Sequence, residues 1–224
     1  MILLVVLTSI LTRFVPFSAF FRNVDTLVHE LSHALVTLVL SGKVMVIYLY
    51  SNQSGVTHSI FAENWMSIPI SLAGYIGSAL FALLLFYLYA KRKEQAGLII
   101  VMVLAAIAAL LFVRNSYGLV WCIGFAILSC LVAFMAPPWL KNGYYILIAF
   151  ICLVESVISP LVILKISLYN PSAAGDAANL AQVTHVPALI WSLVFVAVSL
   201  YCAKISTSLL LKRGFGAKPQ ASNH

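Results

Sequence analysis

Apolar stretches long enough to cross a bilayer recur along the whole length of this 224-residue chain. A membrane-spanning helix needs roughly 20 predominantly apolar residues. Seven candidate spans meet this requirement, at residues 2–21, 24–40, 65–90, 96–113, 117–135, 143–168 and 185–203, although Arg13 and Pro16 interrupt the first. They leave no room for a sizeable soluble domain. The sequence therefore predicts one integral-membrane domain over residues 1–224, an all-α polytopic transmembrane bundle of about six to seven helices.

The charge content agrees with a membrane protein. Hydrophobic residues make up 63% of the chain and charged residues 8%, whereas an ordinary soluble domain carries about 25% charged residues. The net charge of +7 is therefore interpreted as orientation in the lipid bilayer, and no nucleic-acid partner is expected. Lys and Arg are more abundant on the side that holds residues 91–93 and the C-terminus. Because cytoplasmic loops carry the excess of these residues, we expect the C-terminus to be cytoplasmic.

Residues 43–61, between the second and third candidate spans, have the pattern of a β-hairpin. Val44, Val46, Tyr48 and Tyr50 form a β-rich run, and turn residues at 51–55 separate it from a second run at 56–61. The segment is too short and too polar to cross the bilayer alone. We expect a small membrane-associated β-hairpin after the second span, and a polar, basic tail at residues 212–224.

His29, Glu30 and His33 form an HExxH motif inside the second candidate span. Residues four apart on a helix share a face, so both imidazoles can hold one ion. Glu30, next to the first ligand, can then take a proton from the water that the ion polarises. Zinc suits this set because a catalytic zinc takes three protein ligands and keeps one position open. The alternative is a pair of helix-packing histidines within a polar bundle, but the apolar surroundings favour the metal.

A third zinc ligand must come from elsewhere in the chain. Acids inside apolar segments are the candidates, because an ionised group in hydrocarbon needs a partner. Asp176 follows an Asn-Pro pair and several small residues, a pattern typical of a loop or a helix start. Its alternative role is that of a solvated loop acid. Glu155 is the alternative third metal ligand, and its other interpretation is a neutral carboxyl or a partner of Lys165 or Ser156.

The predicted topology leaves the choice between these two acids open. If all seven candidates cross fully, His29 lies near the inner side and Asp176 toward the outer side, yet ligands of one ion must share a depth. Glu155 lies about half-way along a span that runs in the same direction as the second. Three alternatives follow: one span is re-entrant, with a break at Pro160; Asp176 reaches inward; or Glu155 is the ligand.

Several short segments belong together with the HExxH motif. They are residues 28–35 (VHELSHAL), 54–59 (SGVTHS), 73–75 (AGY), 114–118 (RNSYG) and 175–181 (GDAANLA). Together they resemble the bacterial membrane zinc metallopeptidases of the site-2 protease type, in particular a small peptidase-like branch, over residues 24–201. The resemblance implies that His29, His33 and Asp176 bind Zn²⁺ and that Glu30 is the catalytic general base. The order Gly175-Asp176 departs from the Asp-Gly order common in that family.

The resemblance also implies an activity and a location. It implies an intramembrane zinc metalloprotease, multi-pass in a bacterial cell membrane, that hydrolyses peptide bonds in or near the transmembrane segments of membrane-protein substrates. The hairpin is expected either to offer a strand edge to an unwound substrate or to be a structural plug. An oxyanion donor is also expected, with Asn115 and Asn179 as polar candidates. The alternative functions are a catalytically inactive membrane scaffold or a metal transporter related to such proteases.

Overall fold

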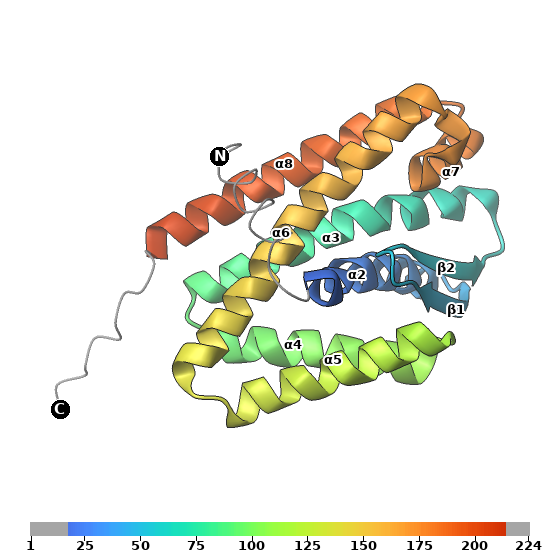
Figure 1. Ribbon diagram of the computed structural model, residues 1–224. Helices are drawn as coiled ribbons and strands as arrows, with labels where there is room; N and C mark the ends of the chain where they lie inside the picture. Colours follow the sequence, from blue (N-terminus) through green and yellow to red (C-terminus); the bar gives the residue numbers. More distant parts are fainter. Residues whose placement is uncertain (1–17, 214–224) are drawn as a thin grey trace.

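The computed structural model describes residues 18–213 of the chain (Figure 1). Helices dominate the described part, and a hairpin of two antiparallel strands follows the first of them. The helices are α2 (Ser18–Val39), α3 (Ser67–Ala90), α4 (Glu94–Ile107), α5 (Ser116–Met135), α6 (Pro138–Tyr169), α7 (Gly175–Thr184) and α8 (Ala188–Arg213), and the strands are β1 (Lys43–Leu49) and β2 (Gly55–Ile60). The prediction of an all-α bundle with a β-hairpin directly after the HExxH helix is confirmed.

Five helical segments of the described part are long and apolar enough to cross a membrane. They are Asn64–Ala90, Glu94–Phe112, Ser116–Met135, Pro138–Tyr169 and Ala188–Arg213. The first four agree closely with the predicted spans 65–90, 96–113, 117–135 and 143–168, because runs of apolar residues that end at charged or Pro-containing loops mark such helices clearly. The last prediction, 185–203, is displaced, since α8 begins three residues later and continues to Arg213.

The HExxH helix α2 differs from these five segments. It packs against α3, α6 and both strands, and it carries Arg22, Asp25 and Glu30 within its length. The predicted boundary at residues 22–24 is wrong, because α2 runs without a break from Ser18 through Arg22. Residues 2–17 of the first predicted span lie outside the described residues. The early start places His29 and His33 in the second half of α2, toward the hairpin.

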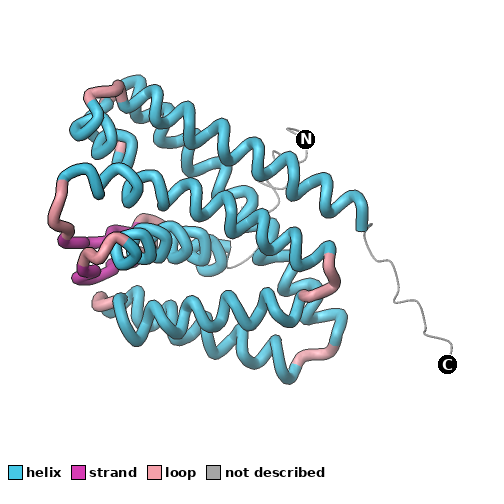
Figure 2. The backbone as a smooth tube through the Cα atoms, turned by 180° about the vertical axis from the view of Figure 1, so that it is seen from behind, coloured by secondary structure: helices cyan, strands magenta, loops and turns pink. Residues whose placement is uncertain are grey.

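The hairpin covers α2 with one face, and its two edges have different neighbours. Ile47 and Leu49 of β1 are fully buried. On the outer edge of β1, Ile47 forms a parallel bridge with Val113, and Asn115 makes two side-chain hydrogen bonds with the Leu49 backbone. Within the described residues, β2 pairs only with β1, in antiparallel register. Among residues 18–213, no strand pairs with the opposite edge of β2, which we call its free edge. Figure 2 shows the hairpin from behind, beside the helices at one end of the bundle.

The chain returns to this same end after α6. Pro160 lies inside α6 without interrupting it, so the alternative of a re-entrant span with a break at that residue is wrong. A 3₁₀ turn at Pro171–Ala173 and a left-handed Gly175 then lead into α7, which packs against α3 and α8. In Figure 1, α7 and the hairpin lie at the same end of the molecule, opposite the α3–α4 turn. The first turn of α7 is thereby directed toward the second half of α2.

Candidate metal centre

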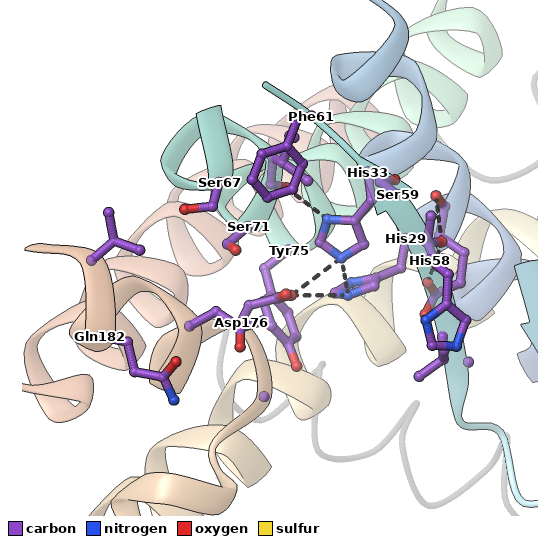
Figure 3. A pocket seen from close by; sticks show the side chains of 18 residues that line it. His29, His33, His58, Ser59, Phe61, Ser67, Ser71, Tyr75, Asp176 and Gln182 are labelled. Atoms are coloured by element: carbon purple, nitrogen blue, oxygen red, sulfur yellow. Dashed lines mark hydrogen bonds and ion pairs between the residues drawn. The ribbon is translucent and has the colours of Figure 1, made fainter. Parts of the chain in front are cut away.

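Three potential metal ligands converge between α2 and α7. His29 and His33 lie one turn apart on α2, and Asp176 lies in the first turn of α7. The His29 Nε2 and His33 Nε2 atoms are 3.1 Å apart, and Asp176 Oδ2 is 3.2 Å and 3.3 Å from them (Figure 3). The three atoms form an almost equilateral triangle. Burial alone would raise the pKa of Asp176, but the neighbouring His33 and His29 side chains hold this pKa below its ordinary value.

The size of this triangle fits a tetrahedral zinc ion. Nitrogen and carboxylate ligands lie about 2.0–2.2 Å from zinc, so two ligand atoms of a tetrahedron are about 3.3–3.5 Å apart. The observed separations of 3.1–3.3 Å are close to that edge length. Two imidazole nitrogens and one carboxylate oxygen are also ligands that zinc prefers. The donor set and its spacing therefore suit a catalytic zinc with a fourth position left open.

Helix α3 orients the two imidazole rings. His33 Nδ1 lies 2.6 Å from the Ile70 carbonyl oxygen, to which it can donate, and this leaves Nε2 free as a ligand. The Tyr75 ring packs edge-on against His29, with centroids 4.5 Å apart. Gly74 lies directly beneath both rings: a Cβ atom there would come within 2.6 Å of His33 Nε2. The absence of a side chain at this position therefore makes room for the two ligands.

Strand β2 holds the side chain of Glu30. The Thr57 hydroxyl lies 2.6 Å from Glu30 Oε2, at a distance typical of a hydroxyl that donates to a carboxylate. The other carboxylate oxygen faces the backbone of Gly55, where a Cβ atom would come within 2.6 Å of Oε1. Glu30 is buried, with 4% of the residue exposed. Its carboxylate is therefore held between α2 and β2, beside the triangle of potential ligands.

The triangle and Glu30 line one cavity of about 550 Å³. Five consecutive residues of β2, Gly55 to Ser59, form one wall, which means that the cavity borders the free edge of the strand and not one face of the sheet. Helix α7 forms the opposite wall with Asp176, Asn179 and Gln182. Hydroxyl groups and apolar side chains, among them Phe61 and Ile70, complete the lining, so the cavity can accept a peptide backbone together with apolar side chains.

The other sequence candidates lie elsewhere. Glu155, the alternative ligand, pairs with Arg22 inside the bundle, with Oε1 and Nε 2.6 Å apart, and the structure brings Asp176 to the histidines in its place. Asn115 binds the end of β1 and does not line the cavity, whereas Asn179 does. Of the two polar candidates for an oxyanion donor, only Asn179 is therefore near the site.

Sequence reasoning missed the supporting residues of this site. Gly74 and Thr57 enter the sequence analysis only as members of short segments that resemble the family, and Ile70 does not enter it as a site residue. The 54–59 and 73–75 segments that contribute to the family resemblance do include Thr57 and Gly74. The signal was therefore present as a pattern, but which atoms these residues contact depends on how α2, α3 and β2 pack.

Comparison with known protein families agrees with the resemblance. A family model described as Peptidase M50B-like matches residues 1–206. No curated protein and no solved structure matches the chain. The family match covers most of the chain, including the HExxH helix, the hairpin and α7. Together with the five apolar helices, it makes this a multi-pass membrane protein.

Proposed function

Because the chain belongs to the Peptidase M50B-like family, which is the site-2 protease family, we propose that it is an intramembrane zinc metalloprotease. It hydrolyses peptide bonds in or near the transmembrane segments of membrane-protein substrates. The observation that carries this proposal is the convergence of His29, His33 and Asp176 beside the carboxylate of Glu30, within one cavity. A peptidase of this type needs a three-ligand metal site and a general base on the same wall of a substrate-sized space.

His29, His33 and Asp176 would hold the zinc ion, with His33 oriented by the Ile70 carbonyl. When bound, zinc lowers the pKa of water to about 7 and polarises a carbonyl oxygen. Glu30 acts as the general base, because its carboxylate lies in the cavity beside these ligands. It accepts the proton of the attacking water and returns that proton to the leaving amine, so the hydrolysis ends with a neutral amine, a carboxylic acid and an unchanged Glu30.

The free edge of β2 would hold the substrate. A transmembrane helix has its backbone hydrogen bonds closed, so its peptide bonds must be unwound before they can react. An unwound segment in a site with little water needs new partners for its N–H and C=O groups, and adding a strand to a sheet edge supplies them. The edge of β2 borders the cavity over Gly55 to Ser59. This placement supports the substrate-strand interpretation of the hairpin.

The distribution of basic residues supports an orientation. Lys91, Arg92 and Lys93 lie in the α3–α4 turn. The end of α8, with Lys212 and Arg213, lies at the same side, because Arg213 pairs with Glu94 at the start of α4. Lys43 begins β1, and Arg114 follows Val113, which bridges to β1. By the positive-inside rule, the C-terminus is cytoplasmic and the cavity opens toward the opposite half of a bacterial cell membrane. The lipid bilayer then surrounds the exposed apolar side chains of the five spans.

The substitution Glu30→Gln tests the proposal. The variant should retain one zinc per chain, because Glu30 is not among the three ligands, and should lose cleavage of a single-span reporter protein by at least about 100-fold. Purified protein is measured for zinc by mass spectrometry and for cleavage in detergent. Glu63→Gln is the matched control, since it makes the same change at an exposed residue between β2 and α3.

Two results would contradict the proposal. Cleavage by Glu30→Gln at the wild-type rate would show that another group is the base. Wild-type protein that holds no zinc after metal supplementation would leave a catalytically inactive membrane scaffold, and zinc transport into vesicles without cleavage would identify a metal transporter.

A further inference from the structure

Strand β2 contacts the side chain of Glu30 at two points, and these distinguish its carboxylate oxygens. Thr57 Oγ1 lies 2.6 Å from Oε2, and the Gly55 backbone lies against Oε1 and the side-chain carbons. The Thr57 hydroxyl is also 3.2 Å from the Glu30 backbone carbonyl. A hydroxyl has one proton to donate, and the shorter contact with a charged acceptor is the stronger one. Thr57 therefore donates to Oε2.

This donation leaves the two oxygens with different chemical capacities. Oε2 already accepts a strong hydrogen bond, which reduces its ability to take a proton from water. Oε1 lies beside the Gly55 backbone, and no protein donor within the described residues binds it, so its lone pairs remain available to accept a proton. The carboxylate can no longer rotate to exchange its oxygens without breaking the bond to Thr57.

We infer that Thr57 is a positioning residue, which fixes the orientation of the Glu30 carboxylate and leaves Oε1 as the proton-accepting atom. This inference rests on the proposed function, in which Glu30 is the general base. It also gives β2 a second role. The strand whose free edge borders the cavity is hydrogen-bonded to the base, so a peptide that binds along β2 stiffens the element that aligns Glu30.

A purely structural role for Thr57 makes a different prediction. In that case its hydroxyl only links β2 to α2, and the loss of any comparable hydrogen bond between these two elements should lower kcat equally. The chain offers such a bond about two turns further along α2, where the Thr37 hydroxyl lies 3.0 Å from Ser59 Oγ and also 2.9 Å from the His33 backbone carbonyl oxygen of its own helix. Thr37 does not line the cavity. Thr37→Val therefore removes a bond of the same kind between the same elements, away from Glu30.

The first experiment compares Thr57→Val, Thr57→Ser and Thr37→Val with the wild type, all as zinc-loaded full-length protein on the single-span reporter. Thr57→Val keeps the shape of the side chain and removes its hydroxyl, so kcat should fall about 10- to 100-fold with KM and zinc content near wild type. Thr57→Ser restores the hydroxyl and should recover kcat to within about threefold. Thr37→Val should leave kcat unchanged.

The second experiment reads the contact without catalysis. The infrared band that Glu30→Gln removes from the wild-type spectrum identifies the Glu30 carboxylate. That band should shift in Thr57→Val, return in Thr57→Ser, and stay in place in Thr37→Val.

The inference is overturned if Thr57→Val leaves the band or kcat unchanged, or if Thr37→Val lowers kcat equally. A wild-type protein that cleaves no reporter contradicts the proposed function, and the infrared band then still decides the contact between Thr57 and Glu30.

Discussion

Replacing Gly74 by alanine should empty the metal site while leaving the bundle folded. A Cβ atom at residue 74 would lie 2.5 Å from His29 Nε2 and 2.6 Å from His33 Nε2. Uncompressed contacts between such atoms are about 3.5 Å, so the rings must move by about 1 Å. Metal–ligand distances tolerate deviations of only about 0.2 Å. For comparison, misplacing a reacting group by about 1 Å lowers a catalytic rate by about 100-fold, and we take the effect on metal binding to be of the same order. We therefore expect the zinc affinity of Gly74→Ala to fall by about 100-fold or more.

The assay is a zinc titration against a competing chelator, with purified protein and its thermal midpoint measured in parallel. Gly124 of α5 provides the matched control, because a Cβ there meets nothing within 4 Å. Gly124→Ala should keep the wild-type zinc affinity and gain about 0.5–1 kcal/mol from the better helix former.

A second control separates ligand displacement from a general loosening of α2 and α3. Gly77 lies one turn further along α3, where a Cβ would meet the Ser32 side chain. Gly77→Ala should lower the thermal midpoint and keep zinc, because Ser32 is not a ligand. If Gly74→Ala binds one zinc with wild-type affinity, the positions given to the two imidazoles are wrong.

Three further changes have distinct expected outcomes. Glu155→Ala leaves the half-buried Arg22 without its carboxylate, so stability should fall by about 2–3 kcal/mol in denaturant unfolding while one zinc stays bound; loss of zinc would make Glu155 a ligand after all. Asn115→Ala removes both bonds to Leu49 and should cost about 1–3 kcal/mol without changing zinc affinity, whereas an altered affinity would place Asn115 in the site. Removing zinc with 1,10-phenanthroline should stop reporter cleavage and adding zinc should restore it; cleavage that persists would argue against a metalloprotease.

The parts of this molecule that follow local rules could be predicted from the sequence. Span boundaries were close for α3 to α6, because long apolar runs end at charged turns or at Pro. The hairpin followed from alternating β-formers on both sides of a polar turn. The pairing of His29 with His33 needed only the 3.6-residue period of a helix.

The parts that depend on how helices cross were missed or left open. The sequence predicts a break between two spans at Arg22. Helix α2 nevertheless continues through this residue, because Glu155 pairs with Arg22 and neutralises its charge inside the bundle. The earlier start of α2 places both histidines in the half of the helix nearest the hairpin. His29, His33 and Asp176 can then lie at the same depth in the membrane, so Glu155 is no longer needed as the third ligand. Gly74 of α3 and Thr57 of β2 contact side chains of α2, and a local sequence pattern does not predict contacts between separate elements.

The separation of the candidate ligands along the chain has a consequence for biosynthesis. Both histidines belong to the first described helix, whereas Asp176 follows four further helices, α3 to α6. At ordinary rates of translation, the ribosome needs on the order of ten seconds to make the intervening chain. During that interval the nascent protein carries an incomplete donor set beside its base. If the proposed activity is correct, the site is completed only when α7 has been made, so the nascent chain cannot cut neighbouring membrane proteins, or itself, before then.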